Sequence, residues 1–282
     1  MNESHALASV LEFYKSLPFN YRGSAKEQAE RDTATNPLDH HTALAEVIKP
    51  GMRVLDLGCG AGWFSNAMAR HCDVRMTGLD FNPVAVGRAR QVADILGLDV
   101  EFIEGDLFGF RSKQPFQVVV SMGVLHHTGD CAAGFRHICR NLLAPGGYAY
   151  IGLYHTYGRK PFLDHFASLK ANGASEEDLY QEYRSLHQTI KDETMLRSWF
   201  RDQVLHPHET QHTQSEMNAL LQDEGMELAA SSINRFQPFS TPSELDAMEP
   251  LYEERAQGYL RQRQYFPGFF LFLAKKGNAY RR

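Results

Sequence analysis

Apolar runs alternate with helix-like segments in the central part of the chain, and this alternation predicts its fold. Five β-prone runs fall in residues 51–154: Arg53–Leu57, Val74–Leu79, Val100–Ile103, Phe116–Met122 and Tyr148–Tyr154. Helical spacing follows at Trp63–His71, from Asn82-Pro83 to about Leu96, and over Cys131–Leu142. Strands that alternate with helices of this size indicate an α/β fold, a parallel sheet with helices on both faces.

The pattern changes on either side of this core. Residues 1–50 read as a polar, helical N-terminal segment, and residues 155–212 are polar, helical in places and rich in histidine. A helix is expected over Ser215–Glu224, behind the capping box that starts at Thr213. Two last strands, Glu227–Ile233 and Gly268–Ala274, flank a helical stretch at about 242–264. We therefore predict a doubly wound, seven-stranded mixed sheet, a helical cap inserted at 155–212, and a C-terminal part of the sheet with its own helical insertion at 213–282.

Three glycines stand directly after the first predicted strand. The run Val54–Leu57 continues as Gly58-Cys59-Gly60-Ala61-Gly62. Glycine adopts backbone conformations that are closed to other residues, and it lets a ligand approach the main chain closely. The second strand ends about twenty residues later in Asp80, a spacing that suits a carboxylate for the two hydroxyls of a ribose. The glycines stand closer together than in the dinucleotide fingerprint, and the Gly-Lys-Ser/Thr ending of a phosphate loop is absent.

Composition and charge narrow the class of partner. The 282 residues carry a net charge of −5 without a long basic run, which argues against a broad nucleic-acid surface. No apolar stretch approaches the ~20 residues of a membrane helix, and the N-terminus lacks the pattern of a secretory signal. Four scattered cysteines without a Cys-x-x-Cys pair fit reduced thiols. We expect a cytoplasmic protein with neither a membrane nor a nucleic-acid partner; its oligomeric state is not indicated.

Five segments, in the right order, resemble the motifs of class I S-adenosylmethionine-dependent methyltransferases. Val54–Gly62 resembles the first motif, and Gly78–Phe81 the acidic end of the second strand. Glu104–Leu107, Phe116–His127 and Leu143–Gly147 resemble the later ones. The resemblance implies a Rossmann-like, cofactor-binding core over residues 51–154, S-adenosylmethionine as the cofactor, and methyl transfer to a small molecule, as in bacterial members of this type.

The resemblance also implies roles for residues of the glycine turn and of the second strand end. Gly58 and Gly60 would let the backbone pass the methionine and ribose portions of the donor. Asp80 would accept hydrogen bonds from both ribose hydroxyls; its alternative role is to cap the next helix, which begins at Asn82-Pro83. Phe81 would lie against the adenine face or belong to the core.

Four further residues receive roles from the same resemblance. Asp106 would take the adenine amino group, with the Leu107 amide nearby. Asp56 would help to place the methionine ammonium group, or would be a buried structural acid bonded to the turn. Ser121, at the end of the fourth strand, would lie near the sulfonium.

Histidines and a tyrosine follow the fourth and fifth strands, at the edge of the sheet where open α/β folds bind ligands. His126 and His127 are candidate catalytic residues that could face the acceptor, and Tyr154 and His155 are candidate acceptor contacts. Methyl transfer requires a general base only when the acceptor arrives protonated with a high pKa. An aromatic segment near the N-terminus adds Tyr21, which would contact the acceptor and close over the cofactor, or would pack between the first helices.

The inserted segment carries a denser polar cluster. Asp202 and His206 are candidate acceptor contacts and His208 a candidate catalytic residue; Phe200–Glu209 resembles a segment of a bacterial methyltransferase subgroup. Residues 208–212 spell the His-Glu-x-x-His pattern of zinc proteases, which requires a continuous helix to bring both histidines to one face. Pro207 precedes the pattern and the next helix begins near Thr213, so we predict a loop and no metal site.

Two other functions remain open from the sequence. Methylation of RNA or protein would need a basic rim, for which Arg159-Lys160, Lys275-Lys276 and Arg281-Arg282 are sparse. A non-catalytic module that only binds the cofactor is the third reading; degenerate members usually lose the glycine turn or the ribose acid, and this chain keeps both.

Overall fold

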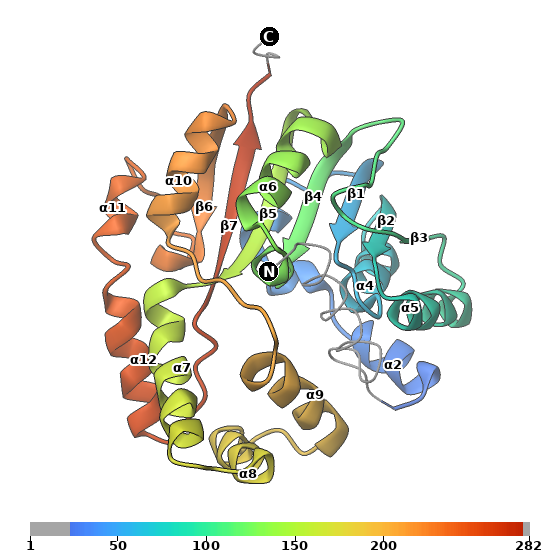
Figure 1. The fold of residues 1–282 in the computed structure, drawn as a ribbon. Helices are drawn as coiled ribbons and strands as arrows, with labels where there is room; N and C mark the ends of the chain where they lie inside the picture. Colours follow the sequence, from blue (N-terminus) through green and yellow to red (C-terminus); the bar gives the residue numbers. More distant parts are fainter. Residues whose placement is uncertain (1–22, 279–282) are drawn as a thin grey trace.

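A seven-stranded sheet forms the centre of the computed structural model, which describes residues 23–278. Its strand order is β3-β2-β1-β4-β5-β7-β6 (Figure 1). The strands are β1 (Met52–Leu57), β2 (Val74–Asp80), β3 (Glu101–Glu104), β4 (Phe116–Met122), β5 (Leu143–Tyr154), β6 (Met226–Ser231) and β7 (Phe269–Lys276). The first five pair in parallel, and β7 runs antiparallel to both β5 and β6. The predicted mixed sheet of seven strands is confirmed.

Alternate residues of the central strands point into two different cores. Leu55 of β1 and Val119 of β4 belong to the core beneath α6 (Cys131–His137) and α10 (Gln214–Asp223). Val54 and Val118, one position earlier, belong to the core beneath α4 (Trp63–His71) and the short α3 (Thr42–Ala45). Strands that are buried on both faces read as continuous apolar runs, which is why the sequence showed these strands clearly.

Three more elements complete the N-terminal side. α5 (Pro83–Leu96) packs on Cys59 and Phe102 beside β2 and β3, and α2 (Ala25–Asp32) packs against α5 and α4. A single 3₁₀ turn, Pro37–Asp39, leads to α3. Asn82 caps α5 through its side chain, and Pro83 occupies the first turn. The helix thus begins at the Asn82-Pro83 pair, as predicted from the sequence.

A helical cap stands over the carboxyl ends of the parallel strands. It contains α7 (Thr156–Ala171), α8 (Glu176–Leu186) and α9 (Glu193–Val204), which lie below the sheet in Figure 1. Its own apolar core joins Phe162, Tyr183 and Phe200. α12 (Leu251–Arg261), from the C-terminal part, packs along α7, so the cap is built from two stretches of sequence rather than from 155–212 alone.

A few boundaries differ from the predictions. β5 begins at Leu143 rather than Tyr148, because Leu143 pairs with Phe116 before an irregularity shifts the register. The helix expected to reach Leu142 ends as α6 at His137 and continues as a π turn over Ile138–Leu142. The helical stretch predicted near 242–264 is two helices, the short α11 (Ser243–Asp246) and α12. Among the helices of residues 23–278, none has the length and apolar character needed to cross a membrane.

Candidate functional site

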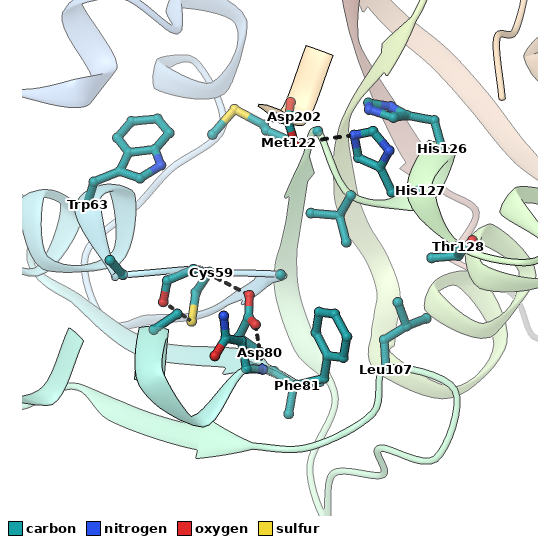
Figure 2. A pocket seen from close by; sticks show the side chains of 18 of the residues that line it. Cys59, Trp63, Asp80, Phe81, Leu107, Met122, His126, His127, Thr128 and Asp202 are labelled. Atoms are coloured by element: carbon teal, nitrogen blue, oxygen red, sulfur yellow. Dashed lines mark hydrogen bonds and ion pairs between the residues drawn. The ribbon is translucent and has the colours of Figure 1, made fainter. Parts of the chain in front are cut away.

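One large cavity opens at the carboxyl edge of the parallel strands, between the sheet and the cap. Its volume is about 450 Å³. One part of the cavity, which we call the donor half, is lined by the glycine turn and by the ends of β2 and β3. The other part, the acceptor half, is lined by the ends of β4 and β5, by α9 and by the chain before β7. Asp80 and Phe81 lie on one side of the view in Figure 2, and His127 and Asp202 on the other. Ten predicted site residues meet in this lining: Gly58, Gly60, Asp80, Phe81, Asp106, Leu107, His126, His127, Tyr154 and Asp202.

The glycine turn places two glycines for two different reasons. Gly58 has φ +82°, and a Cβ there would collide with the Val124 side chain. Gly60 has φ +52°, and nothing lies within 4 Å of the position a Cβ would take, so the turn leaves open space on the cavity side. The Gly58 amide donates to the Leu79 carbonyl (2.7 Å), and the Gly60 amide donates to Asp80. This turn therefore offers a ligand space beside the backbone more than it offers free amide donors.

Asp80 at the end of β2 holds both adjoining turns. Its Oδ2 accepts from the Gly60 amide (2.8 Å) and its Oδ1 from the Asn82 amide (2.9 Å), as the dashed lines in Figure 2 show. Burial raises the pKa of Asp80, and these amide hydrogen bonds oppose the rise. Phe81 is half-buried and lies beside Asp80 in the lining. Each carboxylate oxygen keeps acceptor capacity for a ligand hydroxyl.

Asp106 and Leu107 follow β3 and close the far side of the donor half. Asp106 is partly fixed by its own turn, because its Oδ1 accepts from the Phe108 amide (3.2 Å). Trp63, at the start of α4, also lines the cavity and is 36% exposed, whereas its neighbour Phe64 is buried in the core. Phe64 thus anchors the start of α4 in the core, whereas Trp63 presents surface to the cavity.

Two predicted donor contacts lie outside the lining. Asp56 is 4% exposed and accepts a hydrogen bond from the Ser65 hydroxyl (2.6 Å); burial raises its pKa to about 7. Ser121 is fully buried and donates to the Leu57 carbonyl (3.1 Å). Asp56 thus has the position of a buried structural acid, although its partner is a hydroxyl rather than the amides of the turn. Ser121 ties β4 to β1 and does not reach the cavity.

The acceptor half is built around two buried histidines in the turn Leu125–His127 after β4. The His126 Nδ1 accepts from the Tyr154 amide (3.3 Å), and the rings of His126 and Tyr154 stand 4.3 Å apart. The His127 Nδ1 lies 3.1 Å from the His208 carbonyl, to which it donates, so in the neutral ring Nε2 carries the lone pair. Burial lowers the pKa of His127 to about 4, and it lowers the pKa of His126 well below its usual value. Both rings are neutral near pH 7.

Asp202 and His206 stand beside His127. The Asp202 Oδ1 is 3.8 Å from the His127 Nε2, and the His206 ring lies 3.9 Å from the His127 ring, tilted by 33°. Burial lowers the pKa of His206 to about 3. Asp202 lines the cavity, whereas His206 lies behind His127 and outside the lining. The sequence grouped Asp202 with His206, but only the fold brings His127 to them.

The His-Glu-x-x-His stretch forms a strap across the ends of β4 and β5. It is not helical, as predicted: the Thr210 amide donates to the His126 carbonyl (2.8 Å) and the His212 amide to the Tyr154 carbonyl (2.9 Å). His208 does not line the cavity; its Nε2 bonds to the Thr128 carbonyl (2.8 Å) and its own carbonyl holds His127. The structure thus does not place the His208 side chain at the cavity, where a catalytic residue would lie; the backbone carbonyl of His208 is what contacts His127.

His155 also lies away from the cavity. It is fully buried, its Nε2 is 2.8 Å from the Glu249 Oε2, and its Nδ1 accepts from the Gly158 amide at the start of α7. The same Glu249 carboxylate accepts from the amides of Gln214 and Ser215 at the start of α10. His155 therefore joins three elements and is not an acceptor contact; Tyr154, one residue earlier, lines the cavity as expected.

A buried ion pair that the sequence did not reveal supports the acceptor half. Arg159 is fully buried and donates through Nε and Nη2 to both oxygens of Glu209 (2.9 and 2.8 Å) and to the Gln203 carbonyl (2.7 Å). Its guanidinium carbon stands 4.1 Å from the centre of the Tyr154 ring. Arg159 therefore does not belong to the sparse basic rim that the sequence suggests. Its place beside Lys160 in a polar segment gives no sign of this role.

The aromatic wall of the acceptor half comes from the chain before and within β7. Tyr265, Pro267, Phe269 and Leu271 line it. Sequence reasoning missed all four, because no motif marks them. The N-terminal residue expected here, Tyr21, lies outside the described residues.

Comparisons with known proteins agree with this architecture. A family model described as "Methyltransferase domain" matches residues 48–231. The ubiquinone biosynthesis O-methyltransferase of Stutzerimonas stutzeri (strain A1501) is 32% identical over 138 residues, which cover 48% of this chain and 55% of that protein. The chain thus spans about half the length of the curated relatives it matches.

Two solved structures share the fold. Magnesium protoporphyrin IX methyltransferase from Synechocystis PCC 6803, with bound SAH, has a TM-score of 0.53 at 16% identity and covers 98% of this chain and 96% of its own. PKMT2 from Rickettsia typhi has a TM-score of 0.59 at 15% identity and covers 92% of this chain and 55% of its own. At such identities the likeness concerns the fold alone.

Proposed function

The chain belongs to the methyltransferase-domain family, that of the class I S-adenosylmethionine-dependent enzymes, and on that premise we propose that it methylates a hydroxyl oxygen of a small, largely apolar acceptor. One observation carries the proposal: a single cavity has the glycine turn and Asp80 at one end and His127 with Asp202 at the other. Donor and acceptor would thus meet in one cavity, which is the main requirement of an in-line transfer.

The donor half fits S-adenosylmethionine in room and in chemistry. The open space beside Gly60 admits a ligand against the backbone, and Asp80 and Asp106 offer carboxylates to the ribose and to the adenine amino group. Phe81 and Leu107 offer apolar surface to the adenine ring. The lining formed by described residues contains three aspartates and neither lysine nor arginine, which favours a cationic ligand. When bound, the donor supplies a methyl group on positively charged sulfur.

The acceptor half can take up the proton that an attacking hydroxyl must lose. When the acceptor oxygen takes the methyl group that the bound donor supplies, the hydroxyl proton would pass to the His127 Nε2 and the donor would leave as an uncharged thioether. The His208 carbonyl holds the Nδ1 proton of His127, so Nε2 is the nitrogen that can accept this proton, although burial lowers the pKa of the ring to about 4. The imidazolium so formed would lie 3.8 Å from the Asp202 carboxylate, which stabilises it.

The lining of the acceptor half supports an apolar, ring-containing acceptor. Tyr154, Tyr265, Phe269 and Leu271 present aromatic and aliphatic surface next to the polar pair. The curated relative named above is an O-methyltransferase of ubiquinone biosynthesis, which is in keeping with such a substrate.

A polymeric acceptor is less well supported by the charges of the described surface. RNA or an acidic protein would require basic side chains at the mouth of the cavity. Arg159 is buried against Glu209, and the Lys276 ammonium group donates to the Cys139 and Leu143 carbonyls. Salt-sensitive binding of RNA by the purified protein would count for a polymeric acceptor.

The test is transfer of labelled methyl groups from S-adenosylmethionine to a panel of hydroxylated aromatic compounds, matched with their amine and thiol analogues. We expect label on the hydroxylated members and, at low S-adenosylmethionine concentration, labelling that is roughly 10- to 100-fold slower with Asp80→Ala. Asp39→Ala, which changes an exposed acid of the 3₁₀ turn, should behave as wild type. Tight cofactor binding without transfer to any member would favour the non-catalytic module. Label on amines alone would replace the oxygen acceptor by nitrogen.

A further inference from the structure

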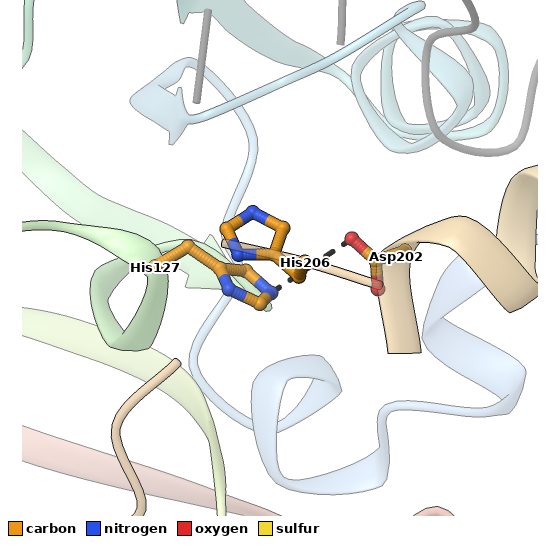
Figure 3. A group of neighbouring side chains, drawn as sticks. All are labelled: His127, Asp202 and His206. Atoms are coloured by element: carbon orange, nitrogen blue, oxygen red, sulfur yellow. Dashed lines mark ion pairs between the residues drawn. The ribbon is translucent and has the colours of Figure 1, made fainter. Parts of the chain in front are cut away.

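Three metal-binding side chains converge at the acceptor end of the cavity. His127, Asp202 and His206 each offer one ligand atom, and these atoms lie within 4.8 Å of one another. Among residues 23–278, this is the only group of three or more histidine, cysteine or acidic side chains close enough to hold one metal ion. Figure 3 shows the two rings lying over each other and Asp202 at the end of α9, facing His127. His127 and Asp202 are buried and His206 is partly so.

We propose that His127, Asp202 and His206 bind a divalent transition-metal ion of the zinc type, whose remaining coordination position takes the oxygen of the acceptor. This inference deepens the proposed function and rests on it for the identity of the acceptor atom. The ion would be the group that selects an acceptor with a coordinating oxygen over one without it.

The donor set decides the class of ion. Two imidazoles and one carboxylate suit zinc and neighbouring transition metals, whereas Mg²⁺ and Ca²⁺ prefer sets made of oxygen. Three protein ligands with one position left for water or substrate is the arrangement of catalytic rather than structural zinc sites. The open position would face the cavity, because His127 and Asp202 line it while His206 lies behind.

A second layer of contacts already orients His127 for such an ion. The His127 Nδ1 donates to the His208 carbonyl (3.1 Å), and His208 is itself held by its Nε2 contact to the Thr128 carbonyl (2.8 Å). A backbone carbonyl on the far nitrogen is the usual means of fixing the tautomer and the direction of a metal-binding histidine. The strap that contains His208 thus acts on the site without supplying a ligand.

Loading requires a small local change. Ligand atoms around a tetrahedral ion with bonds of about 2.1 Å stand roughly 3.4 Å apart, so ligand atoms up to 4.8 Å apart must approach each other by up to about 1.4 Å. The His206 Nδ1 accepts from the His208 amide (3.1 Å), and a ring that binds an ion through one nitrogen must carry its proton on the other. We therefore expect the His206 ring to turn and give up this contact when the ion binds.

The ion would change how the acceptor loses its proton. A coordinated hydroxyl has a lowered pKa, so its proton leaves to water and the oxygen remains on the ion as the nucleophile. In the metal-free protein the His127 Nε2 takes that proton instead.

Titration of the chelator-treated full chain with Zn²⁺ in a calorimeter tests the inference, and Co²⁺ absorption reports the ligand set. We expect one Zn²⁺ per chain, at least about tenfold weaker binding in Asp202→Asn and His206→Gln, and visible cobalt bands that both variants lose. His212→Gln changes another histidine of the strap and should keep the wild-type affinity, and His165→Gln is the control in the cap. Circular dichroism and cofactor affinity establish that each variant is folded.

Two results would overturn the inference: no stoichiometric binding by the wild type, or equal affinity in wild type, Asp202→Asn and His206→Gln. Loss of binding in His212→Gln, with binding kept in Asp202→Asn and His206→Gln, would also overturn it, since the ion would then occupy the His-Glu-x-x-His stretch. The proposed function fails separately. Methyl transfer that persists without bound metal leaves it intact, and metal binding without any methyl transfer removes it while the site remains.

Discussion

The two halves of the cavity are built in different ways. The donor half takes its residues from the turns directly after three adjacent strands, at 58–60, 80–81 and 106–107, and backbone amides hold its acids in place. The acceptor half gathers residues from the turn after β4, the end of β5, α9 and the chain before β7. The first can be recognised from short motifs, whereas the second exists only once distant segments have packed together.

The halves also differ in what stabilises them. Asp80 depends on amides that any sequence with the same backbone would supply. The acceptor half depends on particular side chains in contact, above all the buried pair of Arg159 with Glu209 and the group around His127. Single substitutions should therefore disturb the folding of the acceptor half more than that of the donor half.

Loss of the buried ion pair should have the largest effect. Arg159→Met leaves Glu209 as an uncompensated buried charge, and we expect the free energy of unfolding to fall by about 3–5 kcal/mol in urea denaturation. Arg263→Met removes a partner from Glu182 in a pair whose arginine is half exposed, and should cost about 0–1 kcal/mol. Equal losses in the two variants would show that burial does not distinguish the pairs. Adding Glu209→Gln to Arg159→Met should restore part of the loss.

Removal of the His127 ring should separate the two halves functionally. His127→Gln is expected to lower kcat by about 100-fold with the best acceptor of the panel. The variant lacks the Nε2 lone pair that would accept the acceptor's proton or, if the ion is bound, would hold that ion. Calorimetry should give a cofactor affinity within about twofold of wild type, since His127 lies in the other half. A parallel fall in cofactor affinity would mean that the halves are one coupled site.

A change in the donor half should show the converse. Asp80→Ala removes the carboxylate expected to bind the ribose, and the affinity for S-adenosylmethionine should fall by roughly 10- to 100-fold, the value of a charged hydrogen bond. The fold should survive, as judged by circular dichroism, because the Gly60 and Asn82 amides can turn to water at the cavity. Unchanged affinity would remove Asp80 from the donor site.

The smallest effect is expected at Asp56, just outside the donor half. Its pKa of about 7 lies above the unfolded value, so the folded protein holds the proton more tightly and the free energy of unfolding falls as pH rises from about 4 to 7. Asp56→Asn abolishes this penalty, so the variant should gain stability relative to wild type as the pH rises from 5 to 8. Its cofactor affinity should not change. A tenfold weaker affinity would instead make Asp56 the partner of the donor's ammonium group.

Much of the fold and of the donor half could be predicted because the signals are local. The β1 and β4 runs are apolar on both faces, and Gly58 and Gly60 need positive φ within a few residues of a strand end. The sequence misplaced side chains whose position depends on a contact with a residue far away in the chain. His155 looked like a residue of the cavity edge, but Glu249, 94 positions later, draws it into the core.

The sequence by itself determined the order of strands and helices, the glycine turn and the acids that follow β2 and β3, since these depend on periodicity and on backbone requirements close along the chain. Only the tertiary structure decided which histidines face the cavity, that Arg159 is buried with Glu209, and that His127 meets Asp202 and His206. Such contacts join residues 50 to 80 positions apart, and burial and pairing energies across that separation leave no periodic trace in the sequence.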